Sequence, residues 1–292
     1  MRLVLTLLVR NEEDILATNI EYHLARGVDF IIVTDNRSED RTPEILEHYA
    51  SRGVLRVIEE RSDDYDQRRW VTRMARMAAT EHGADWVINA DADEFWWPLE
   101  AESLGGALAS VPPTADAVHA ERHDFLPHPG GSGHSPVRQM TTRKQLSLNV
   151  HGDPLRPKIC HRASPSIVIG QGNHDVYRRT PLLRRKQRLC SVDAGIEILH
   201  FPLRSYAQFE RKIALGGAAY TRNRSVTRDE GSTWRMLHEE YLAGRLPDFF
   251  AAQAPTAAER KAGLEEGRFL IDERLVRYLD EQVGPLDGMA AD

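Results

Sequence analysis

Residues 3–9 have the sequence Leu3-Val4-Leu5-Thr6-Leu7-Leu8-Val9, and the polar residues Arg10-Asn11-Glu12 follow at once. A nearly continuous apolar run of this length is typical of a strand that is covered on both faces. Strands of this kind belong to parallel sheets with helices packed on each side. The opening of the chain therefore predicts an α/β fold with a buried first strand.

The next ninety residues alternate between helical patterns and short apolar runs. Helices are expected between Asn11, which can cap the first of them, and Gly27, then between Thr42 and Gly53, and from about Asp66 to His82. In the third helix, Trp70, Met74 and Met77 form an apolar stripe that belongs to a core. Further strands are expected at Phe30–Val33, Val54–Ile58 and Trp86–Ile88. This alternation predicts right-handed crossovers and a largely parallel sheet.

The pattern changes after about residue 120. Glycine, proline and histidine crowd between Pro127 and Pro136, which predicts a mobile loop. Short strand-like pieces follow at Lys158–Arg162, Ser166–Ile169 and Glu197–Phe201, and a charged helical pattern runs from Thr256 to Gln282. We therefore expect a first half at residues 1–115, a second half of the same domain at 116–250, and a helical tail at 251–292.

Composition bounds the class of protein. The chain has 292 residues, of which 41% are hydrophobic and 28% charged, with a formal net charge of −6, so a dedicated nucleic-acid binder is disfavoured. No stretch approaches the roughly 20 apolar residues that cross a bilayer, which favours a cytoplasmic protein without a transmembrane segment. Cys160 and Cys190 match no metal or disulfide pattern and are expected to be buried thiols.

Polar clusters follow three of the predicted strands. They are Arg10-Asn11-Glu12, Thr34-Asp35-Asn36 and Asp91-Ala92-Asp93-Glu94. In parallel α/β sheets, ligands bind beyond the carboxyl ends of the strands. Three polar strand ends at one edge of the sheet therefore predict a binding site there.

The pair Asp91 and Asp93 carries the chemical prediction. Alternate residues of an extended segment point to the same side, so both carboxylates can face one ligand. Mg²⁺ commonly takes one or two carboxylates together with substrate phosphates, and a metal neutralises the charge of a leaving diphosphate. The alternative is a solvated acidic turn, which the large neighbours Phe95, Trp96 and Trp97 disfavour.

Asp35 ends the second strand, where its carboxylate can accept hydrogen bonds from a ribose hydroxyl or a base imide. The residues after it, Ser38, Asp40 and Thr42, suit a turn and a helix cap. We assign Asp35 to the ligand and the rest to structure.

Four segments together resemble the opening and the metal-binding signature of a family-two-like glycosyltransferase of the GT-A fold. They are Leu5-Thr6-Leu7-Leu8-Val9-Arg10-Asn11-Glu12, Gly27-Val28-Asp29, Asp35-Asn36-Arg37-Ser38-Glu39-Asp40-Arg41-Thr42 and Ala84-Asp85-Trp86-Val87-Ile88-Asn89-Ala90-Asp91-Ala92-Asp93-Glu94-Phe95-Trp96. Two later segments, Gly172-Asn173-His174-Asp175 and Leu199-His200-Phe201-Pro202-Leu203-Arg204-Ser205, resemble the same group less firmly.

The resemblance implies a GT-A-like α/β fold with a mostly parallel mixed sheet flanked by helices, in which residues 1–115 bind the nucleotide sugar and residues 116–250 bind the acceptor. It also implies a nucleoside diphosphate sugar as donor, Mn²⁺ or Mg²⁺ as cofactor, and transfer with inversion. It places Asp35 at the nucleoside, Asp91 at the ribose or metal, and Asp93 at the metal. The chain departs from the commonest family-two pattern at Asn36, where a second acidic residue often stands. It also lacks a clear Glu-Asp pair further on, which leaves the catalytic base open.

Other candidate residues flank these segments. His200 ends an apolar run and is a candidate metal ligand, with a structural histidine as the alternative. Arg204 suits the diphosphate, while Gln67 and Arg68 at a helix start suit the base or the phosphates. Asp175 is the favoured general base, with Asp124 and Glu94 as rivals.

A cationic run extends from Arg178 through Arg179, Arg184, Arg185 and Lys186 to Arg188. It is interpreted as a flexible solvated loop, with contact to an anionic acceptor or a membrane surface as the alternative.

The sequence disfavours three other functions. A sugar-phosphate nucleotidyltransferase would need a glycine-rich phosphate loop after the first strand, where this chain has Arg10-Asn11-Glu12-Glu13. A non-catalytic nucleotide-sugar-binding protein is disfavoured by the intact Asp35, Asp91 and Asp93. A phosphatase with an Asp-x-Asp nucleophile would place that pair after the first strand. The donor base, the sugar and the acceptor (a glycan, a lipid-linked group or a small molecule) are left open.

Overall fold

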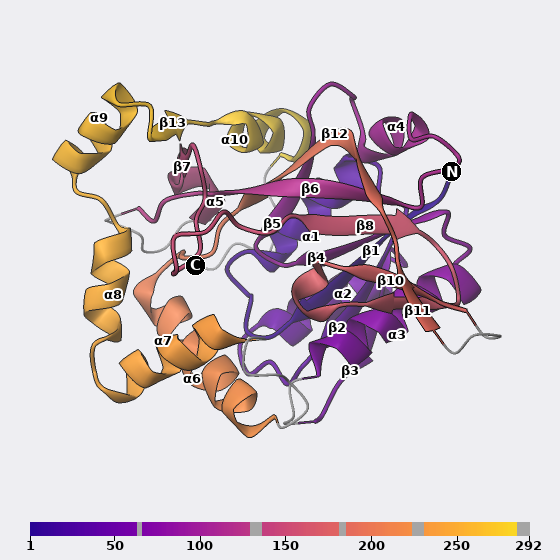
Figure 1. Cartoon of the computed structure of the whole chain (residues 1–292), viewed down its shortest axis with the longest axis horizontal. Coiled ribbons are helices and arrows are strands. Elements are labelled where there is room, and N and C mark those ends of the chain that lie inside the picture. Colours follow the sequence, from indigo (N-terminus) through magenta and orange to yellow (C-terminus); the bar gives the residue numbers. More distant parts are fainter. Residues whose placement is uncertain (63–65, 129–135, 181–184, 224–230, 285–292) are drawn as a thin grey trace. The chain divides into compact units, whose positions relative to one another are not determined.

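The computed structural model describes residues 1–62, 66–128, 136–180, 185–223 and 231–284 (Figure 1). The chain forms two compact units, each with a hydrophobic core of its own. Unit 1 comprises Met1–Arg61, Gln67–Arg122 and Arg156–Leu199, and unit 2 comprises Ser62–Asp66, His123–Leu155 and His200–Asp292.

Among the described residues, the main sheet has eight strands in the order β3-β2-β1-β4-β8-β6-β12-β5. Their bounds are β1 Leu3–Val9, β2 Phe30–Asp35, β3 Leu55–Glu59, β4 Trp86–Asp91, β5 Glu94–Pro98, β6 Ala117–Asp124, β8 Lys158–Arg162 and β12 Ser191–His200. The strands β3, β2, β1 and β4 run parallel, while β8 pairs antiparallel with β4 and with β6. The predicted α/β fold with a mixed sheet is confirmed.

The helices of unit 1 follow the predicted alternation. They are α1 Leu16–Ala25, α2 Thr42–Ser51, α3 Gln67–Thr80 and α4 Leu104–Ala109. Trp70 and Met74 of α3 are buried, and Met77 packs against the core that Val4, Ile32 and other strand residues form. The predicted apolar stripe of α3 is confirmed as core.

The predicted capping role of Asn11 is wrong. Helix α1 begins only at Leu16, and Asn11 adopts a left-handed backbone conformation with φ of 57°. Its side-chain Oδ1 accepts a hydrogen bond from the amide of Glu39 at 2.8 Å. Asparagine tolerates this conformation better than most residues, so Asn11 serves the loop after β1 instead of the helix.

Three short strands form a second sheet in unit 1, in the order β11-β10-β9. They are β9 Ile167–Ile169, β10 Val176–Thr180 and β11 Arg185–Arg188. The interpretation of the cationic run as a flexible loop is wrong for Arg178 and Arg179 on β10 and for Lys186 and Arg188 on β11. The buried residues Val176 and Leu189 anchor the pair of strands and are joined by a backbone hydrogen bond of 2.8 Å. Arg184 lies outside the described residues.

Unit 2 is mainly helical, with a small sheet that pairs β13 with β7. Its elements are α5 Pro136–Gln139, β7 Thr142–Lys144, α6 Tyr206–Arg222, α7 Ser232–Leu242, α8 Leu246–Gln253, α9 Ala257–Glu265, β13 Phe269–Ile271, α10 Arg274–Tyr278 and the π-helical turn η2 Leu279–Val283. Phe209, Ile213, Leu237 and Leu246 form its core. Most of the predicted loop at 127–136 lies outside the described residues.

The prediction of one helical pattern from Thr256 to Gln282 is wrong. Thr256 and Glu259 form a capping box that starts α9, but Gly267 at φ of 72° follows the end of that helix. Residues Phe269–Ile271 then pair antiparallel with β7, so the tail contains a strand between two helices.

The two cysteines differ in their environment. Cys160 is buried, and burial raises the pKa of its thiol to about 12, whereas Cys190 is exposed, so the prediction of two buried thiols is wrong for Cys190. Within the described ranges, no helix combines the length and the apolar character needed to cross a bilayer.

Two buried histidines make the stability of the protein depend on pH. Burial lowers the pKa of His23 and of His161 to about 4. An unfolded histidine takes a proton near pH 6.5, so between pH 6.5 and 4 the unfolded state binds more protons. We therefore expect the free energy of unfolding to fall as the pH is lowered from 6.5 to 4, by about 1.4 kcal/mol per pH unit for each histidine.

Denaturant unfolding at several pH values measures this slope. The variant His161→Asn removes one titrating group but keeps a donor for the carbonyl of Arg162, which His161 Nδ1 contacts at 2.9 Å. Between pH 6 and 5, the free energy of unfolding of this variant should change less with pH than that of the wild type, and the difference should be about the contribution of one histidine. Equal slopes in the two proteins would contradict this account.

Candidate functional site

The parallel pairing of β1 with β2 and β4 brings three polar strand ends to one edge of the sheet in unit 1. Val9 lies opposite Asp35, and Leu8 lies opposite Asp91. The carboxyl ends of the three strands are therefore level, as the sequence predicted. This C-terminal edge of β1, β2 and β4 is the candidate site.

The loops after β1 and β2 are joined by hydrogen bonds. The amide of Asn11 donates to Ser38 Oγ at 2.9 Å, and the amide of Glu12 donates to Thr42 Oγ1 at 2.9 Å. Asp40 Oδ1 accepts from the amide of Thr42 at 2.9 Å. These bonds support a structural role for Ser38, Asp40 and Thr42, and they fix the backbone next to Arg10, which is half-buried.

Asp35 is held in place through one of its two carboxylate oxygens. Oδ1 accepts hydrogen bonds from Ser38 Oγ at 2.6 Å and from the Ser38 amide at 3.1 Å. Burial raises the pKa of the Asp35 carboxyl above its ordinary value, although the Ser38 bonds oppose the shift. Within the described part of the chain, no hydrogen bond to Oδ2 is present, so this oxygen suits a ligand hydroxyl or imide.

The acidic turn, Asp91–Glu94, connects β4 to β5 and is held by a side chain of α1. Buried Asn19 of α1 donates through Nδ2 to the carbonyls of Ala92 and Glu94, both at 2.9 Å. Asp93 and Glu94 are buried, whereas the side chain of Asp91 is 37% exposed. The turn is therefore a rigid, partly buried element and differs from a solvated surface turn.

Lys158 contacts the acidic turn, and sequence reasoning did not assign it a role. It begins β8, and its Nζ donates to Asp91 Oδ2 at 2.7 Å and lies 3.0 Å from Glu94 Oε1. Burial alone would lower the pKa of Lys158, but the two carboxylates more than offset burial and raise it. The signal available in the sequence was a lysine at the start of an apolar strand-like run.

The segment before β10 holds His174 in one tautomer. It contains the 3₁₀ turn η1, Gln171–Asn173. His174 Nδ1 lies 2.9 Å from the carbonyl oxygen of Pro157 and therefore carries the proton, which leaves Nε2 as an acceptor. Burial, and then the charges of Lys158 and Arg122, lower the pKa of His174 to about 3, so its imidazole is neutral at physiological pH. This residue too was not singled out from the sequence.

Gln67 ties the start of α3 to the same segment. Its Oε1 accepts from Gln171 Nε2 at 3.0 Å and from the Gly172 amide at 3.1 Å. Its neighbour Arg68 is exposed. The contacts of Gln67 are those of a structural link, and the predicted ligand contacts of Gln67 and Arg68 stay predictions.

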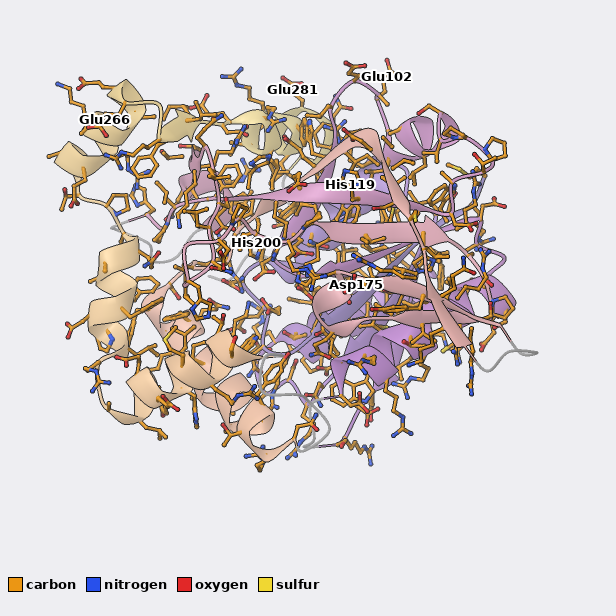
Figure 2. The ribbon with its side chains drawn as sticks, in the orientation of Figure 1. Glu102, His119, Asp175, His200, Glu266 and Glu281 are labelled. Atoms are coloured by element: carbon orange, nitrogen blue, oxygen red, sulfur yellow. The ribbon has the colours of Figure 1, made fainter. Side chains whose placement is uncertain are left out.

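Asp175, predicted as the general base, lies between η1 and β10 and is labelled in Figure 2. Its two oxygens pair with two arginines: Oδ2 with Arg156 at 2.8 Å and Oδ1 with Arg188 at 2.7 Å. Both carboxylate oxygens of Asp175 are therefore engaged by guanidinium groups.

Asp124 and His200 form a pair in unit 2. Asp124 Oδ1 lies 2.7 Å from His200 Nδ1, and the amide of Phe125 donates to the carbonyl of His200 at 2.8 Å. A carboxylate only accepts, so Nδ1 of His200 carries the proton. His200 ends β12 (Figure 2), and Arg204 follows it as a buried side chain that donates to the carbonyl of Phe201 at 3.3 Å.

The carboxylates of the acidic turn fit a divalent cation that shares its coordination with a substrate. Mg²⁺ usually keeps several waters and takes one or two carboxylates together with phosphate oxygens. The side chain of Asp91 is 37% exposed and can offer a carboxylate, whereas Asp93 is buried. The exposure of Asp91 suits this role. Across the described ranges, no group of three or more His, Cys, Asp or Glu side chains is placed to hold a metal ion.

The model of glycosyltransferase family 92 matches residues 6–129 of this chain. By this match, the enzyme class is that of a glycosyltransferase. The matched segment runs from the middle of β1 through β6 and includes the C-terminal edge and the acidic turn. The resemblance of this glycosyltransferase to family two in particular stays a prediction. No curated protein matches the sequence.

Solved structures with a distant likeness to this glycosyltransferase include S. aureus TarS 1-349, at 12% identity, covering 87% of this chain and 83% of that chain with a TM-score of 0.39. The same fragment in complex with UDP matches at 14% identity, the same coverages and a TM-score of 0.40. Glucosyl-3-phosphoglycerate synthase from Mycobacterium tuberculosis, in complex with Mn²⁺, UDP and glucosyl-3-phosphoglycerate, matches at 23% identity, 41% of this chain, 44% of that chain and a TM-score of 0.32.

Gly172 is expected to be essential for the pose of His174. A Cβ at Gly172 would lie 2.7 Å from His174 Cδ2, and φ at Gly172 is +70°. The variant Gly172→Ala should therefore lose both the backbone conformation and the ring position, at a cost of about 1–3 kcal/mol or more. Denaturant unfolding measures the loss.

Gly195 supplies the matched control. Its φ is +63°, but a Cβ there would meet nothing within 4 Å. Gly195→Ala should lower the free energy of unfolding by about 1 kcal/mol, the cost of the left-handed backbone conformation for alanine. If the two variants lost the same stability, the contact with His174 would be unimportant.

Proposed function

We propose that this protein transfers a sugar from a nucleoside diphosphate sugar to an acceptor with the help of a divalent cation, Mn²⁺ or Mg²⁺. The observation that carries the proposal is the register of β1, which sets Asp35 and Asp91 level at the C-terminal edge of the sheet. One carboxylate is thereby available to the nucleoside and another to the diphosphate and its metal.

Donor recognition is proposed to begin at Asp35. Its Oδ1 is held by Ser38, while Oδ2 is placed to accept from a ribose hydroxyl or a base imide. Arg10, Asn11 and Glu12 follow β1 at the same edge, and we propose that they border the nucleotide. Arg204 is proposed as a cation for the diphosphate, on the basis of residue type and the resemblance.

The metal is proposed to be held by Asp91 and Asp93. When bound, it supplies positive charge to the leaving diphosphate. The protein fixes these carboxylates before the substrate arrives, because Asn19 and Lys158 hold the turn that carries them. His200 stays a proposed ligand, and its bond to Asp124 is the kind that orients metal-binding histidines.

The general base is proposed to be one of three carboxylates. The double pairing of Asp175 with Arg156 and Arg188 weighs against it, and the burial of Glu94 beside Lys158 weighs against that residue. Asp124, one oxygen of which accepts from His200, is then the preferred base. Inversion at the anomeric carbon, which requires such a base, is proposed from the resemblance.

The alternative of a sugar-phosphate nucleotidyltransferase receives no support from the loop after β1. That loop contains no glycine and is tied to Ser38 and Thr42. The alternative of a non-catalytic nucleotide-sugar-binding protein is separated from the proposal by a turnover assay with several donors and acceptors.

A thermal-shift screen of nucleoside diphosphates and their sugars, with and without Mn²⁺, tests donor class and metal together. The matching nucleotide should stabilise the protein by about 2.7 kcal/mol at 100 times its Kd. In Asp93→Asn the metal-dependent part of the shift should vanish, and turnover should fall by about 100-fold. Donor hydrolysis, which needs no known acceptor, gives the turnover readout.

Asp116→Asn is the matched control for charge removal in unit 1. Asp116 pairs with Arg178 at 3.0 Å and is not part of the acidic turn. It should keep the metal-dependent shift of the wild type. A response of Asp93→Asn equal to that of the wild type would remove Asp93 from the metal site.

The choice of base is tested with a matched pair of variants. Asp124→Asn keeps an acceptor for His200 Nδ1 but cannot take a proton, so kcat should fall by about 100-fold or more with little change in donor KM. Asp175→Asn should lose less than about tenfold. The reverse ranking would restore Asp175 as the base.

A further inference from the structure

Lys158 is a buried charge whose position the proposed reaction has not yet used. Its side chain is 2% exposed. An ammonium group loses its hydration on burial, and this loss is tolerated when the group is paired with carboxylates. The partners of Lys158 are two residues of the acidic turn, Asp91 and Glu94.

Strand pairing delivers Lys158 to that turn. β8 runs antiparallel to β4, with Trp86 opposite Arg162 and Val87 opposite His161, so the start of β8 lies beside the end of β4. On its other side, Lys158 lies opposite Ala120 of β6. The ammonium is therefore placed by the register of the central sheet and does not depend on a flexible surface loop.

The three residues form a closed arrangement, here called the lysine cluster: Lys158, Asp91 and Glu94. Lys158 Nζ donates to Asp91 Oδ2 at 2.7 Å and forms an ion pair with Glu94 Oε1 at 3.0 Å. Glu94 Oε2 in turn accepts from the backbone amide of Asp91 at 3.2 Å. Both the side chain and the backbone of Asp91 are thus fixed by the other two members.

Exposure distinguishes the members of the cluster. The side chain of Lys158 is 2% exposed and that of Glu94 is fully buried, whereas that of Asp91 is 37% exposed. Arg122 adds a second positive charge beside Glu94, with its Nη1 atom 3.9 Å from Glu94 Oε1. The cluster therefore presents one oriented carboxylate outward and keeps its compensating charge inside.

We propose that Lys158 is a positioning residue of the donor site, which orients Asp91 and competes with the divalent cation for its Oδ2 atom. The inference rests on the proposed function, in which Asp91 is a metal ligand. The ammonium keeps Asp91 in one orientation and weakens the attraction of the site for a metal when no diphosphate is present. Metal capture is thereby coupled to arrival of the donor phosphates.

The test combines metal binding with kinetics in Lys158→Met, which keeps the length of the side chain and removes its charge. Mn²⁺ binding is measured from the electron paramagnetic resonance signal of free Mn²⁺, with and without UDP. Loss of the nearby positive charge should tighten binding of Mn²⁺ alone by at least about threefold. Loss of orientation should lower kcat for donor hydrolysis by at least about tenfold. A merely structural role would not move these two quantities in opposite directions.

Arg162→Met on the same strand is the control. Arg162 donates to the carbonyl of Ala115 at 2.9 Å and should leave Mn²⁺ affinity unchanged. In the Asp91→Asn background, Lys158→Met should no longer tighten Mn²⁺ binding, because the contested oxygen is gone. Should Lys158→Met fail to fold, Lys158→Gln gives the same comparison with a neutral donor.

The outcomes separate this inference from the proposed function. If the wild type binds Mn²⁺ and Lys158→Met binds it no more tightly, the inference is overturned and the proposed function stands. If Lys158→Met binds Mn²⁺ without UDP and the wild type binds it only with UDP, both the inference and the proposed function are supported. If neither protein binds Mn²⁺ with or without UDP, both are overturned.

Discussion

The parallel register of β1 between β2 and β4 is the constraint on which the site depends. With Val9 opposite Asp35 and Leu8 opposite Asp91, two carboxylates that are far apart in sequence end at the same level. A slip of one residue in either pairing would turn every side chain of that strand to the opposite face. The apolar residues of β1 and β4 oppose such a slip, because they are buried almost completely. Packing of the core thus fixes the geometry at the edge.

The loops at this edge depend on hydrogen bonds in place of apolar packing. Asn19, placed by α1, holds the carbonyls of the acidic turn, and Ser38 and Thr42 hold the loop after β1. Each bond satisfies a backbone group that would otherwise be buried without a partner. Ser38 also donates to the carboxylate of Asp35, and Lys158 donates to that of Asp91, so both side chains are oriented. The hydrogen bonds that satisfy the backbone of these loops therefore belong to the same network as those that orient the candidate ligands.

The sequence predicts unit 1 well because its signals are local. Apolar runs, Gly27, Gly53 and Pro43 mark the strands and helices with small errors at their ends, and the alternation determines the parallel sheet. The errors arise where distant partners decide. Asn11 was assigned to a helix cap, but its partner is Glu39 in another loop. The strand Phe269–Ile271 was placed in a helix, since only pairing with β7, over a hundred residues away, makes it a strand.

The same reasoning explains which candidate residues can be placed at this edge from the sequence. Asp35, Asp91 and Asp93 directly follow apolar strands, so their position at an edge can be inferred from the chain alone. Lys158 and His174 reach the neighbourhood of the acidic turn through antiparallel pairing and a tight turn, which no short-range pattern encodes. Asp175 stood out as an acidic residue after glycines, but its two arginine partners come from residues before β8 and on β11. The residue type alone identified these carboxylates as candidates. Only the residues that each carboxylate contacts in the folded protein distinguish a candidate ligand from a member of a salt bridge.

The charges around the acidic turn carry a consequence for stability. A buried ammonium with two carboxylates is often no more stable than well-packed apolar residues of the same volume, because desolvation offsets the attraction. The arrangement of Lys158 and Glu94 is therefore poorly explained by stability alone. It is well explained by preorganisation, in which charges are fixed before substrate binds and need no rearrangement during the reaction. On this view the exposed carboxylate of Asp91 is the functional surface of the cluster, and the two buried members exist to orient it.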